Sequence, residues 1–463
     1  MSRREESDDE VVEVKRRRVE MYRSPLKLIR AEESVVKEQE NVDTVSLAHL
    51  VGQRDLVEIY QFSFEMDLAY AMDLVHPEAR PNIKAYFVFG KSRKGDMAER
   101  LEEQRKTLKY NKNITLVPIP LRYDYGTHHS KLMVLFFSNN EVQITIHTAN
   151  LISYDWENMT QGIWVSPRMS LKGGGEHEFK TDFVDYIRAY KNPCLNKLAD
   201  SLESVNFDDV QNVSFIGSVP GNYEKGSAEY KKWGALKLYD VVSRVEKRIE
   251  DKSDPELIVQ MSSIGSLGPL SSYFNPILKR ALLGQEPHGT DPTRNAKVSI
   301  IFPSLMNIRE SLFGYGSGGS IHFPKDEKGS LQKELRPMLC QWKAKEAGRQ
   351  ILPPHIKTYT RLTKERKVAW MVLTSANLSK QAWGIVNKTK KNQWIQSWEA
   401  GVILSPPSSE PFTPLYKRDT STSPCVRLPF DIPPSPYEDN DEVWSAKVSH
   451  SEPDRFGNIY VPR

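Results

Sequence analysis

Cysteine is scarce in this chain of 463 residues, which contains only three. Cys194, Cys340 and Cys425 lie far apart in the sequence, and no two of them have the spacing of metal ligands. The sequence therefore predicts neither a disulfide framework nor a zinc site, which is typical of a protein in a reducing compartment. We expect the three side chains to be packing residues.

Long hydrophobic runs and a strong excess of one charge are also missing. No apolar run approaches the roughly 20 residues that cross a bilayer, and the first residues are charged, so we expect no membrane span and no secretory signal. A net charge of +4 permits binding to nucleic acid without requiring it. The cluster KRRR at residues 15–18 predicts a nuclear-import signal, with a solvated charge run as the alternative.

The length of the chain exceeds what one hydrophobic core usually organises, so we expect two domains. Residues 1–42 are rich in charged side chains with little apolar periodicity, which predicts a disordered tail. The turn residues of IGSVPG mark a boundary that divides the rest into residues 43–215 and residues 216–463.

Apolar runs predict strands interleaved with helices in both parts, and therefore an α/β sandwich. The expected strands begin at Leu56, Ala85, Lys131, Val142, Leu257, Val298 and Val368. The expected helices cover residues 98–110, 226–249 and 331–347.

An internal repeat carries the chemistry. The first half contains HHSKLMVLFF, IHTANL and TQGIWVSP, and the second contains PHIKTYT, VLTSANL and SWEAGVILSP in the same order. His129 precedes Asn150 by 21 residues, and His355 precedes Asn377 by 22. Such a repeat predicts that a whole domain was duplicated.

Strand geometry decides which side chains of each motif act together. Because side chains alternate across a strand, His129 and Lys131 share one face, whereas His128 and Ser130 share the other. His355 and Lys357 share a face in the second motif in the same way. Asn150 and Asn377 follow apolar strands and lie beside these faces if the strands pair.

Two such sets that face each other have the groups that cleavage of a phosphodiester requires. One imidazole attacks phosphorus, the other protonates the leaving oxygen and then activates water, and Lys131 and Lys357 balance the charge of the phosphate. For this chemistry one histidine begins neutral and the other protonated, so we expect the two pKa values to differ. Gln161 and Glu399 occupy comparable places after the asparagines, one neutral and one anionic, which indicates unequal roles. We expect no metal and no cofactor.

These motifs resemble the phospholipase D superfamily, and within it the tyrosyl-DNA phosphodiesterase family. The larger branch of the superfamily has an Asp five residues after the Lys, where this chain has Phe136 and Leu362. The resemblance also covers TQGIW, GSVPG, SSIGSLG, GYGSGGS and FGNIYVP. It implies two similar α-β-α sandwich domains related by pseudo-twofold symmetry.

The resemblance also implies a role for each residue of the site. His129 would be the nucleophile, which forms a phosphohistidine, and His355 the general acid and base. The non-bridging oxygens would be held by Lys131, Lys357, Asn150 and Asn377, and the histidines would be positioned by Gln161 and Glu399. The DNA strand would contact Ser262, Ser263, Ser266, Ser379 and the stacking ring of Tyr125, whereas Phe64 would line the adduct side of the groove.

The implied substrate is DNA with a tyrosyl or peptide adduct, a remnant of topoisomerase I, on the 3′ phosphate of a single-stranded or frayed end. We expect a nuclear monomer that does not bind membranes. Other 3′ blocking groups remain open as substrates. The alternatives are a lipid or other phosphodiesterase of the superfamily and an inactive scaffold that binds DNA ends.

Overall fold

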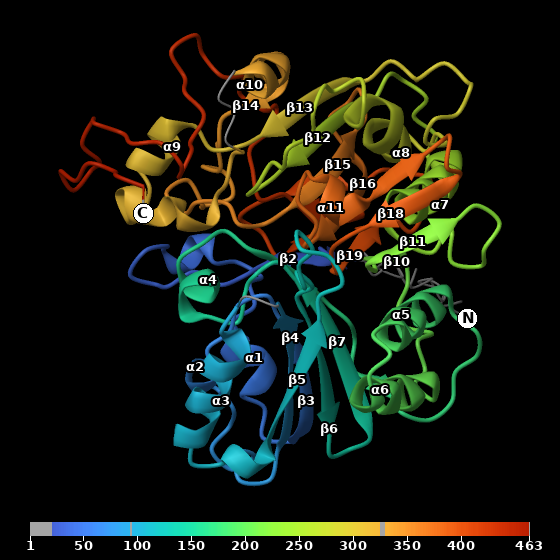
Figure 1. Cartoon of the computed structure of the whole chain (residues 1–463), viewed down its shortest axis with the longest axis vertical. Coiled ribbons are helices and arrows are strands. Elements are labelled where there is room, and N and C mark those ends of the chain that lie inside the picture. Colours follow the sequence, from blue (N-terminus) through green and yellow to red (C-terminus); the bar gives the residue numbers. More distant parts are fainter. Residues whose placement is uncertain (1–20, 93–94, 325–328, 463) are drawn as a thin grey trace, which may run out of the picture.

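Two large β-sheets with the same strand order form the centre of the molecule (Figure 1). The computed structural model describes residues 21–92, 95–324 and 329–462. The order in the first sheet is β2 (Leu26–Leu28), β8 (Gly162–Val165), β7 (Glu141–His147), β6 (Leu132–Phe137), β3 (Leu56–Phe62), β4 (Lys84–Lys91) and β5 (Ile114–Pro120), with β9 (Met169–Ser170) paired to β7 off this path. The order in the second is β10 (Val213–Ser218), β19 (Glu399–Leu404), β16 (Val368–Thr374), β15 (Thr358–Leu362), β12 (Glu256–Gln260), β13 (Lys297–Ile301) and β14 (Leu339–Cys340).

The directions of the strands match as well as their order. In the first sheet β3, β4 and β5 run parallel, and all other neighbours along the path are antiparallel. In the second sheet β12, β13 and β14 run parallel, and the remaining neighbours are again antiparallel. The repeat in the sequence therefore corresponds to a repeated sheet topology.

Helices cover the outer face of each sheet and enter the space between the sheets. The first sheet packs on α1 (Leu47–Val51), α2 (Leu68–Asp73) and α3 (Met97–Thr107), and the second on α7 (Gly234–Arg248) and α8 (Arg280–Leu282), which continues the π-helix Phe274–Lys279. Between the sheets lie α5 (Glu178–Ala189) and α6 (Pro193–Glu203). The shorter helices are α4 (Ser153–Glu157), α9 (Leu305–Arg309), α10 (Ser330–Leu335) and α11 (Lys380–Trp383). The α/β sandwich that the apolar runs predict is confirmed.

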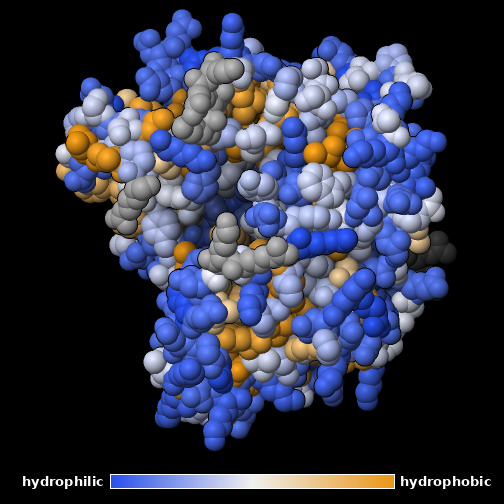
Figure 2. All heavy atoms as spheres, viewed as in Figure 1, coloured by the Kyte–Doolittle hydropathy of each residue, from blue (hydrophilic) through white to orange (hydrophobic). Residues whose placement is uncertain are grey.

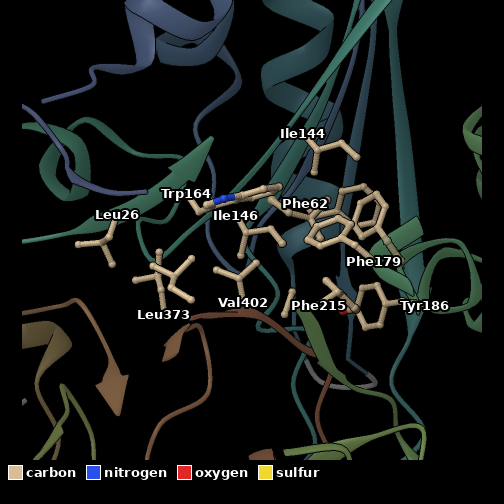
Figure 3. Packing of buried hydrophobic residues seen from close by; sticks show 14 of the residues in the cluster. Leu26, Phe62, Ile144, Ile146, Trp164, Phe179, Tyr186, Phe215, Leu373 and Val402 are labelled. Carbon is tan, nitrogen blue, oxygen red and sulfur yellow. The ribbon is translucent and has the colours of Figure 1, made fainter. Parts of the chain in front are cut away.

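One hydrophobic core joins the two halves. Figure 3 shows Ile144 and Ile146 of β7 pointing into the same space as Leu373 of β16 and Val402 of β19. All four side chains are fully buried, and burial of one such side chain stabilises the fold by about 1.5–3 kcal/mol. The relative position of the two sheets is therefore fixed by packing.

Figure 2 shows that hydrophilic side chains dominate one face of the molecule, which is hollowed where the halves meet.

Residues 21–42 are part of the fold, which differs from the disordered tail expected for residues 1–42. Strand β2 adds to the first sheet beside β8, and β1 (Tyr22–Arg23) pairs with β21 (Thr420–Ser421). Leu26 and Leu28 are buried in the common core. A charge-rich segment is ordered here because its few apolar residues pack on two other parts of the chain. Residues 1–20, which include the KRRR cluster, lie outside the described residues.

Three other expectations change in extent. The boundary expected at residue 216 falls inside β10, which pairs along its length with β19, so the second half begins before Val213. The helix expected over residues 331–347 ends at Leu335, and a 3-10 turn follows from Arg336 to Met338. Pro337 lacks the N–H that a continuing helix requires, and it restricts the residue before it. Similarly, α7 begins at Gly234 instead of residue 226.

A third, smaller sheet lies outside the two large ones. Its order is β11 (Gly221–Glu224), β18 (Asn392–Ile395) and β17 (Ile385–Asn387), all antiparallel, and Figure 1 shows β11 and β18 beside each other above α5. The short strands β20 (Thr413–Leu415) and β22 (Cys425–Arg427) form a parallel pair.

Candidate active site

The first His-x-Lys motif is held in place by the backbone of the second half. His129 lies just before β6, and its N–H donates to the carbonyl of Trp398 over 2.9 Å. The N–H of Trp398 in turn donates to the carbonyl of Thr127 over 2.8 Å. These bonds place Glu399, the first residue of β19, beside His129.

The second motif is held by the first half in the same manner. The N–H groups of His355 and Ile356 donate to the carbonyl of Thr160 over 3.0 and 2.9 Å. The N–H of Thr160 donates to the carbonyl of Pro353 over 3.0 Å. Gln161 follows directly and lies beside His355, so each half of the chain supplies the partner of the other half's histidine.

The contacts of the two histidine rings show how each half supplies the partner of the other half's histidine. His129 Nδ1 lies 2.9 Å from Glu399 Oε2, which also accepts a hydrogen bond of 2.6 Å from Ser375. His355 Nδ1 lies 2.9 Å from Gln161 Nε2, and Gln161 Oε1 accepts a bond of 2.7 Å from Thr148. Thr148 and Ser375 occupy the same place in HTAN and TSAN, so the supporting hydroxyl is repeated as well.

Asp155 is a residue of the site that the sequence did not predict. This fully buried carboxylate on α4 lies 3.2 Å from His355 Nδ1, and it accepts hydrogen bonds from Asn150 N–H and Gln161 Nε2 over 2.7 and 3.3 Å. The second half has Ala382 at the equivalent place in ANLxxxxW, so the repeat gave no signal for it. Both histidines therefore have a carboxylate near Nδ1, which reduces the asymmetry expected from Gln161 and Glu399.

The two motif lysines are fully buried, and the pKa of each is affected by charged groups of both halves. Lys131 Nζ donates to the carbonyl of His129 over 3.0 Å, and Lys357 donates to that of His355. Burial lowers the pKa of Lys131 to about 8, while the carboxylates of Glu399 and Asp155 act in the opposite direction. Burial, and next the charge of Lys131, lower the pKa of Lys357 well below its usual value. Charges from both halves therefore meet in one site.

Burial also lowers the pKa values of both histidines. For His355 the pKa falls to about 3, with Lys357 adding to the effect and Asp155 opposing it. For His129 burial lowers the pKa, Lys131 adds to this, and Glu399 opposes it. The side chain of His129 is 15 % exposed and that of His355 is 6 % exposed, so the first is the easier to reach.

The asparagines differ in how they are anchored. Asn377 Oδ1 accepts hydrogen bonds from the hydroxyl of Ser262 and from the N–H of Ser263, over 3.1 and 2.9 Å. Because a backbone N–H only donates, this contact fixes the amide with its NH₂ group as the remaining donor. Asn150 Oδ1 is buried and has no hydrogen-bond partner in the described part of the chain.

The other face of the first motif has a structural role. His128 lies 3.0 Å from the hydroxyl of Tyr190, and Ser130 lies 2.5 Å from that of Tyr186, both on or next to α5. Burial lowers the pKa of His128 to about 3. The alternation of side chains separates this face from that of His129 and Lys131, as the sequence predicts, whereas the pairing of His129 with Glu399 was not predicted.

The residues expected to contact the substrate differ in their exposure and in their contacts with the site. Phe64 is 44 % exposed and packs edge-on against the ring of His129, with 5.6 Å between the centroids. Ser262 is buried and bonds to Asn377, and Ser379 is the N-cap of α11, where its hydroxyl accepts from Ala382 N–H. Ser266 is exposed, and Tyr125 is 80 % exposed on the loop before His128.

Groups of side chains that could hold a metal ion are absent from residues 21–92, 95–324 and 329–462. In the same ranges no helix combines the length and the apolar character that a membrane span needs.

Cys340 and Cys425 are buried and Cys194 is partly buried, and all three are free thiols.

The comparisons with known proteins agree with one another. Residues 25–438 match the family model described as tyrosyl-DNA phosphodiesterase. A probable tyrosyl-DNA phosphodiesterase of Schizosaccharomyces pombe is 29 % identical and aligns with 93 % of this chain and 94 % of its own length. Tyrosyl-DNA phosphodiesterase 1 of Drosophila melanogaster is 33 % identical, over 73 % of this chain and 60 % of its own length.

A solved structure shows the same architecture. The crystal structure of yeast tyrosyl-DNA phosphodiesterase superposes with a TM-score of 0.71 at 24 % identity, and covers 91 % of this chain and 98 % of that one. The protein is therefore one of the phospholipase D-like fold class, with two His-x-Lys motifs. Because the family model covers most of its length, the chain belongs to the tyrosyl-DNA phosphodiesterase family.

Proposed function

We propose that this protein hydrolyses the bond between the 3′ phosphate of DNA and a tyrosine, through a phosphohistidine on His129 with His355 as general acid and base. The observation that carries this assignment is that the partners of the two imidazoles favour opposite tautomers. Family membership supports the substrate class, and the tautomers support the roles.

The carboxylate partner makes His129 a nucleophile. Glu399 only accepts hydrogen bonds, so Nδ1 of the neutral ring carries the proton and donates it. Nε2 then has a free lone pair with which to attack phosphorus. The carboxylate also stabilises the positive charge that develops on the ring during the attack.

The amide partner prepares His355 to donate a proton. Gln161 Oε1 is occupied by the hydroxyl of Thr148, so Gln161 Nε2 is the group that faces the ring and donates to Nδ1. The proton of the neutral ring is therefore on Nε2. When the ring is protonated, Nδ1–H donates to Asp155 instead, so both charge states have a partner.

The two chemical steps of the proposed reaction balance in bonds and in protons. His129 Nε2 forms a bond to phosphorus while the bond from phosphorus to the tyrosyl oxygen breaks, and protonated His355 gives its proton to that oxygen. His355 next takes a proton from water, whose oxygen attacks phosphorus and releases His129. The phosphate oxygens are stabilised by Lys131, Lys357 and the amides of Asn150 and Asn377.

The bound substrate completes the charge balance. Burial, and after it the two lysines, lower the pKa values of the histidines in the free protein. A phosphodiester adds one negative charge to this site, which favours the charged forms of Lys357 and His355. We infer that protonation of His355 accompanies the binding of the substrate.

Family membership and the single-chain site support the remaining features of the proposal. A peptide remnant of topoisomerase I is the expected adduct, and other 3′ blocking groups are further candidates. Both motifs are in one chain, which supports action as a monomer. Action on DNA ends supports a location in the nucleus.

Trapping of the intermediate tests the roles. With a 3′-phosphotyrosyl oligonucleotide, His355→Ala should accumulate a covalent adduct with DNA, because tyrosine is a good leaving group and the activation of water is lost. His129→Ala should form no adduct, and turnover should fall by at least about 10³-fold in both variants. The variant His49→Ala, which changes an exposed histidine outside the site, is the matched control.

Adduct mapped to another residue, or normal turnover by His355→Ala, would show that the roles are wrong. Wild-type protein should release tyrosine from the oligonucleotide and leave a phosphatidyl lipid intact. Hydrolysis of the lipid alone would refute the proposed substrate.

A further inference from the structure

We propose that a second surface of this protein binds the single-stranded part of the substrate, on the 5′ side of the phosphate that is cleaved. The surface, here called the hairpin surface, consists of Tyr123, Trp394 and the lysines of the turn between β17 and β18, which are Lys388, Lys390 and Lys391. The inference rests on the proposed function, because it requires that the substrate is a nucleic acid strand.

Two aromatic rings form the centre of the hairpin surface. The rings of Tyr123 and Trp394 meet edge to face, with 5.6 Å between their centroids and an angle of 89°. Trp394 is 36 % exposed to solvent, which is high for a residue of this size. An edge-to-face pair leaves ring faces uncovered, and bases of any sequence stack on such faces.

A cavity of about 500 Å³ lies against these rings. Its walls include Tyr123, Trp394, Lys390 and the amides of Asn222 and Asn392, which bond to each other over 2.6 Å. A cavity of this size accommodates a ligand as large as a nucleoside. It combines an apolar ring, amide groups and a cation, which suit the face, the edge and the phosphate of a nucleotide.

The charge of the hairpin surface is positive and unpaired. Residues 122–125, 221–225 and 385–395 contain five cations and only two carboxylates, Asp124 and Glu224. The turn lysines make no ion pair with the described residues, and Arg122 lies over the ring of Tyr123 at 5.5 Å. A cluster of exposed cations beside aromatic rings is complementary to the backbone of a single strand.

The hairpin surface is joined to the active site by the loop that runs from Tyr123 to His129. Thr127 N–H of this loop donates to the hydroxyl of Ser397 over 3.1 Å, which holds the loop against the segment that follows β18. A Cβ on Gly126 would lie 2.3 Å from the carbonyl of Gln396, so the loop and the end of β18 touch closely. The exposed ring of Tyr125 lies between the two regions in sequence. Because the cleaved bond is at the 3′ end, all nucleotides lie on the 5′ side and have this surface available to them.

The length of the substrate provides the test. We would compare 3′-phosphotyrosyl single strands of about 4 and about 16 nucleotides with the wild type, Trp394→Ala, Tyr123→Ala and the triple variant of Lys388, Lys390 and Lys391 to Glu. Each variant should lose about tenfold in kcat/KM on the long strand, through KM, and keep wild-type values on the short one. The triple variant should also show a smaller dependence on salt.

The matched control is the turn between β15 and β16, in which Lys364→Glu and Arg366→Glu reverse two exposed cations. This control should leave kcat/KM unchanged for both lengths. Equal losses on both strands, losses as large in the control, or a loss seen only with duplex DNA would overturn the inference. A wild-type protein that is inactive on both strands would instead contradict the proposed function, so the two failures are distinguishable.

Discussion

At the scale of single residues, each half of the site supplies the partner of the other half's histidine, but the two sets of partners differ. In the first half the residue that follows the asparagine motif is neutral Gln161 and the carboxylate is Asp155 on a helix. In the second half the equivalent positions hold the carboxylate of Glu399 and, on a helix, the apolar Ala382. The exchange preserves one carboxylate per histidine, while the group 2.9 Å from Nδ1 is a carboxylate for His129 and an amide for His355.

Asp155 should be important for the acid step. Replacement by Asn removes the group that accepts Nδ1–H from protonated His355, so we expect kcat to fall by about 10²-fold with a smaller change in KM. Steady-state kinetics with the tyrosyl oligonucleotide measure this split. Asp55→Asn, which breaks an ion pair with Arg168 on the surface, is the control and should retain activity.

An unchanged kcat in Asp155→Asn would show that Gln161 alone supports His355. Because Asp155 also accepts from the N–H of Asn150, the thermal midpoint should be measured for both variants. A purely structural role would lower the midpoint without changing the pH profile of the remaining activity.

The charge of Lys131 should set an upper pH limit for binding. Burial lowers its pKa to about 8, so the ammonium is present below this pH and is lost as the pH rises through it. We expect kcat/KM of the free protein to decline above about pH 8, since a neutral amine attracts the phosphodiester less strongly. Lys131→Arg, whose side chain stays charged, should move this decline to higher pH. The profile of kcat/KM from pH 6 to about 10 is the measurement, and identical alkaline limbs would contradict the assignment to Lys131.

At the scale of elements, the segment that contains β1 and β2 joins both halves. β2 pairs with β8 of the first sheet, while the hydroxyl of Ser24 accepts from Arg427 N–H over 2.8 Å. Further along this segment, Asn41 accepts a bond of 2.9 Å from the buried guanidinium of Arg349. The segment is thus anchored at both ends by the second half of the chain.

Leu26 should show how much this segment contributes to stability. Its side chain is fully buried in the common core, so Leu26→Ala should lower the free energy of unfolding by about 2–5 kcal/mol. Urea denaturation measures the change. Met21→Ala, at a side chain 53 % exposed in the same segment, should change it by less than about 0.5 kcal/mol. Similar values for the two variants would show that packing of β2 matters little.

The elements differ in how far the sequence predicts them. The runs that begin at Leu56 and Val368 form β3 and β16 at the expected positions, because continuous apolar runs are typical of strands buried on both faces. Helices α5 and α6 were not predicted, although their apolar residues face the common core. The helix predicted from Leu331 was too long, because it ran past Pro337, whereas the helix in the structure ends at Leu335.

At the scale of the whole molecule, the two sheets and α5 share one core, and several ionisable side chains are buried with it. Burial lowers the pKa values of His128, His147 and His355 to about 3 each. The folded state therefore holds these rings neutral, while the unfolded chain protonates them near their ordinary value of about 6.5.

Acid should therefore destabilise the whole protein. As the pH falls below about 6.5, the unfolded state binds more protons, so the free energy of unfolding decreases by up to about 1.4 kcal/mol per pH unit for each histidine. Urea denaturation at pH 7.5, 6 and 5 measures this slope. His147→Leu should reduce the slope by the share of one histidine, and an unchanged slope would show that His147 is protonated in the folded state.

The sequence by itself determined the duplicated motifs, the strands that carry them and the side of each strand on which His129 and Lys131 lie, because these depend on order and on the period of two along a strand. It did not determine which residue contacts which ring. Only the tertiary structure decided that Glu399 pairs with His129, that Gln161 and Asp155 pair with His355, and that residues 21–42 belong to the fold. The physical reason is that these contacts join segments far apart in the chain, and packing of the two sheets in one core brings them together.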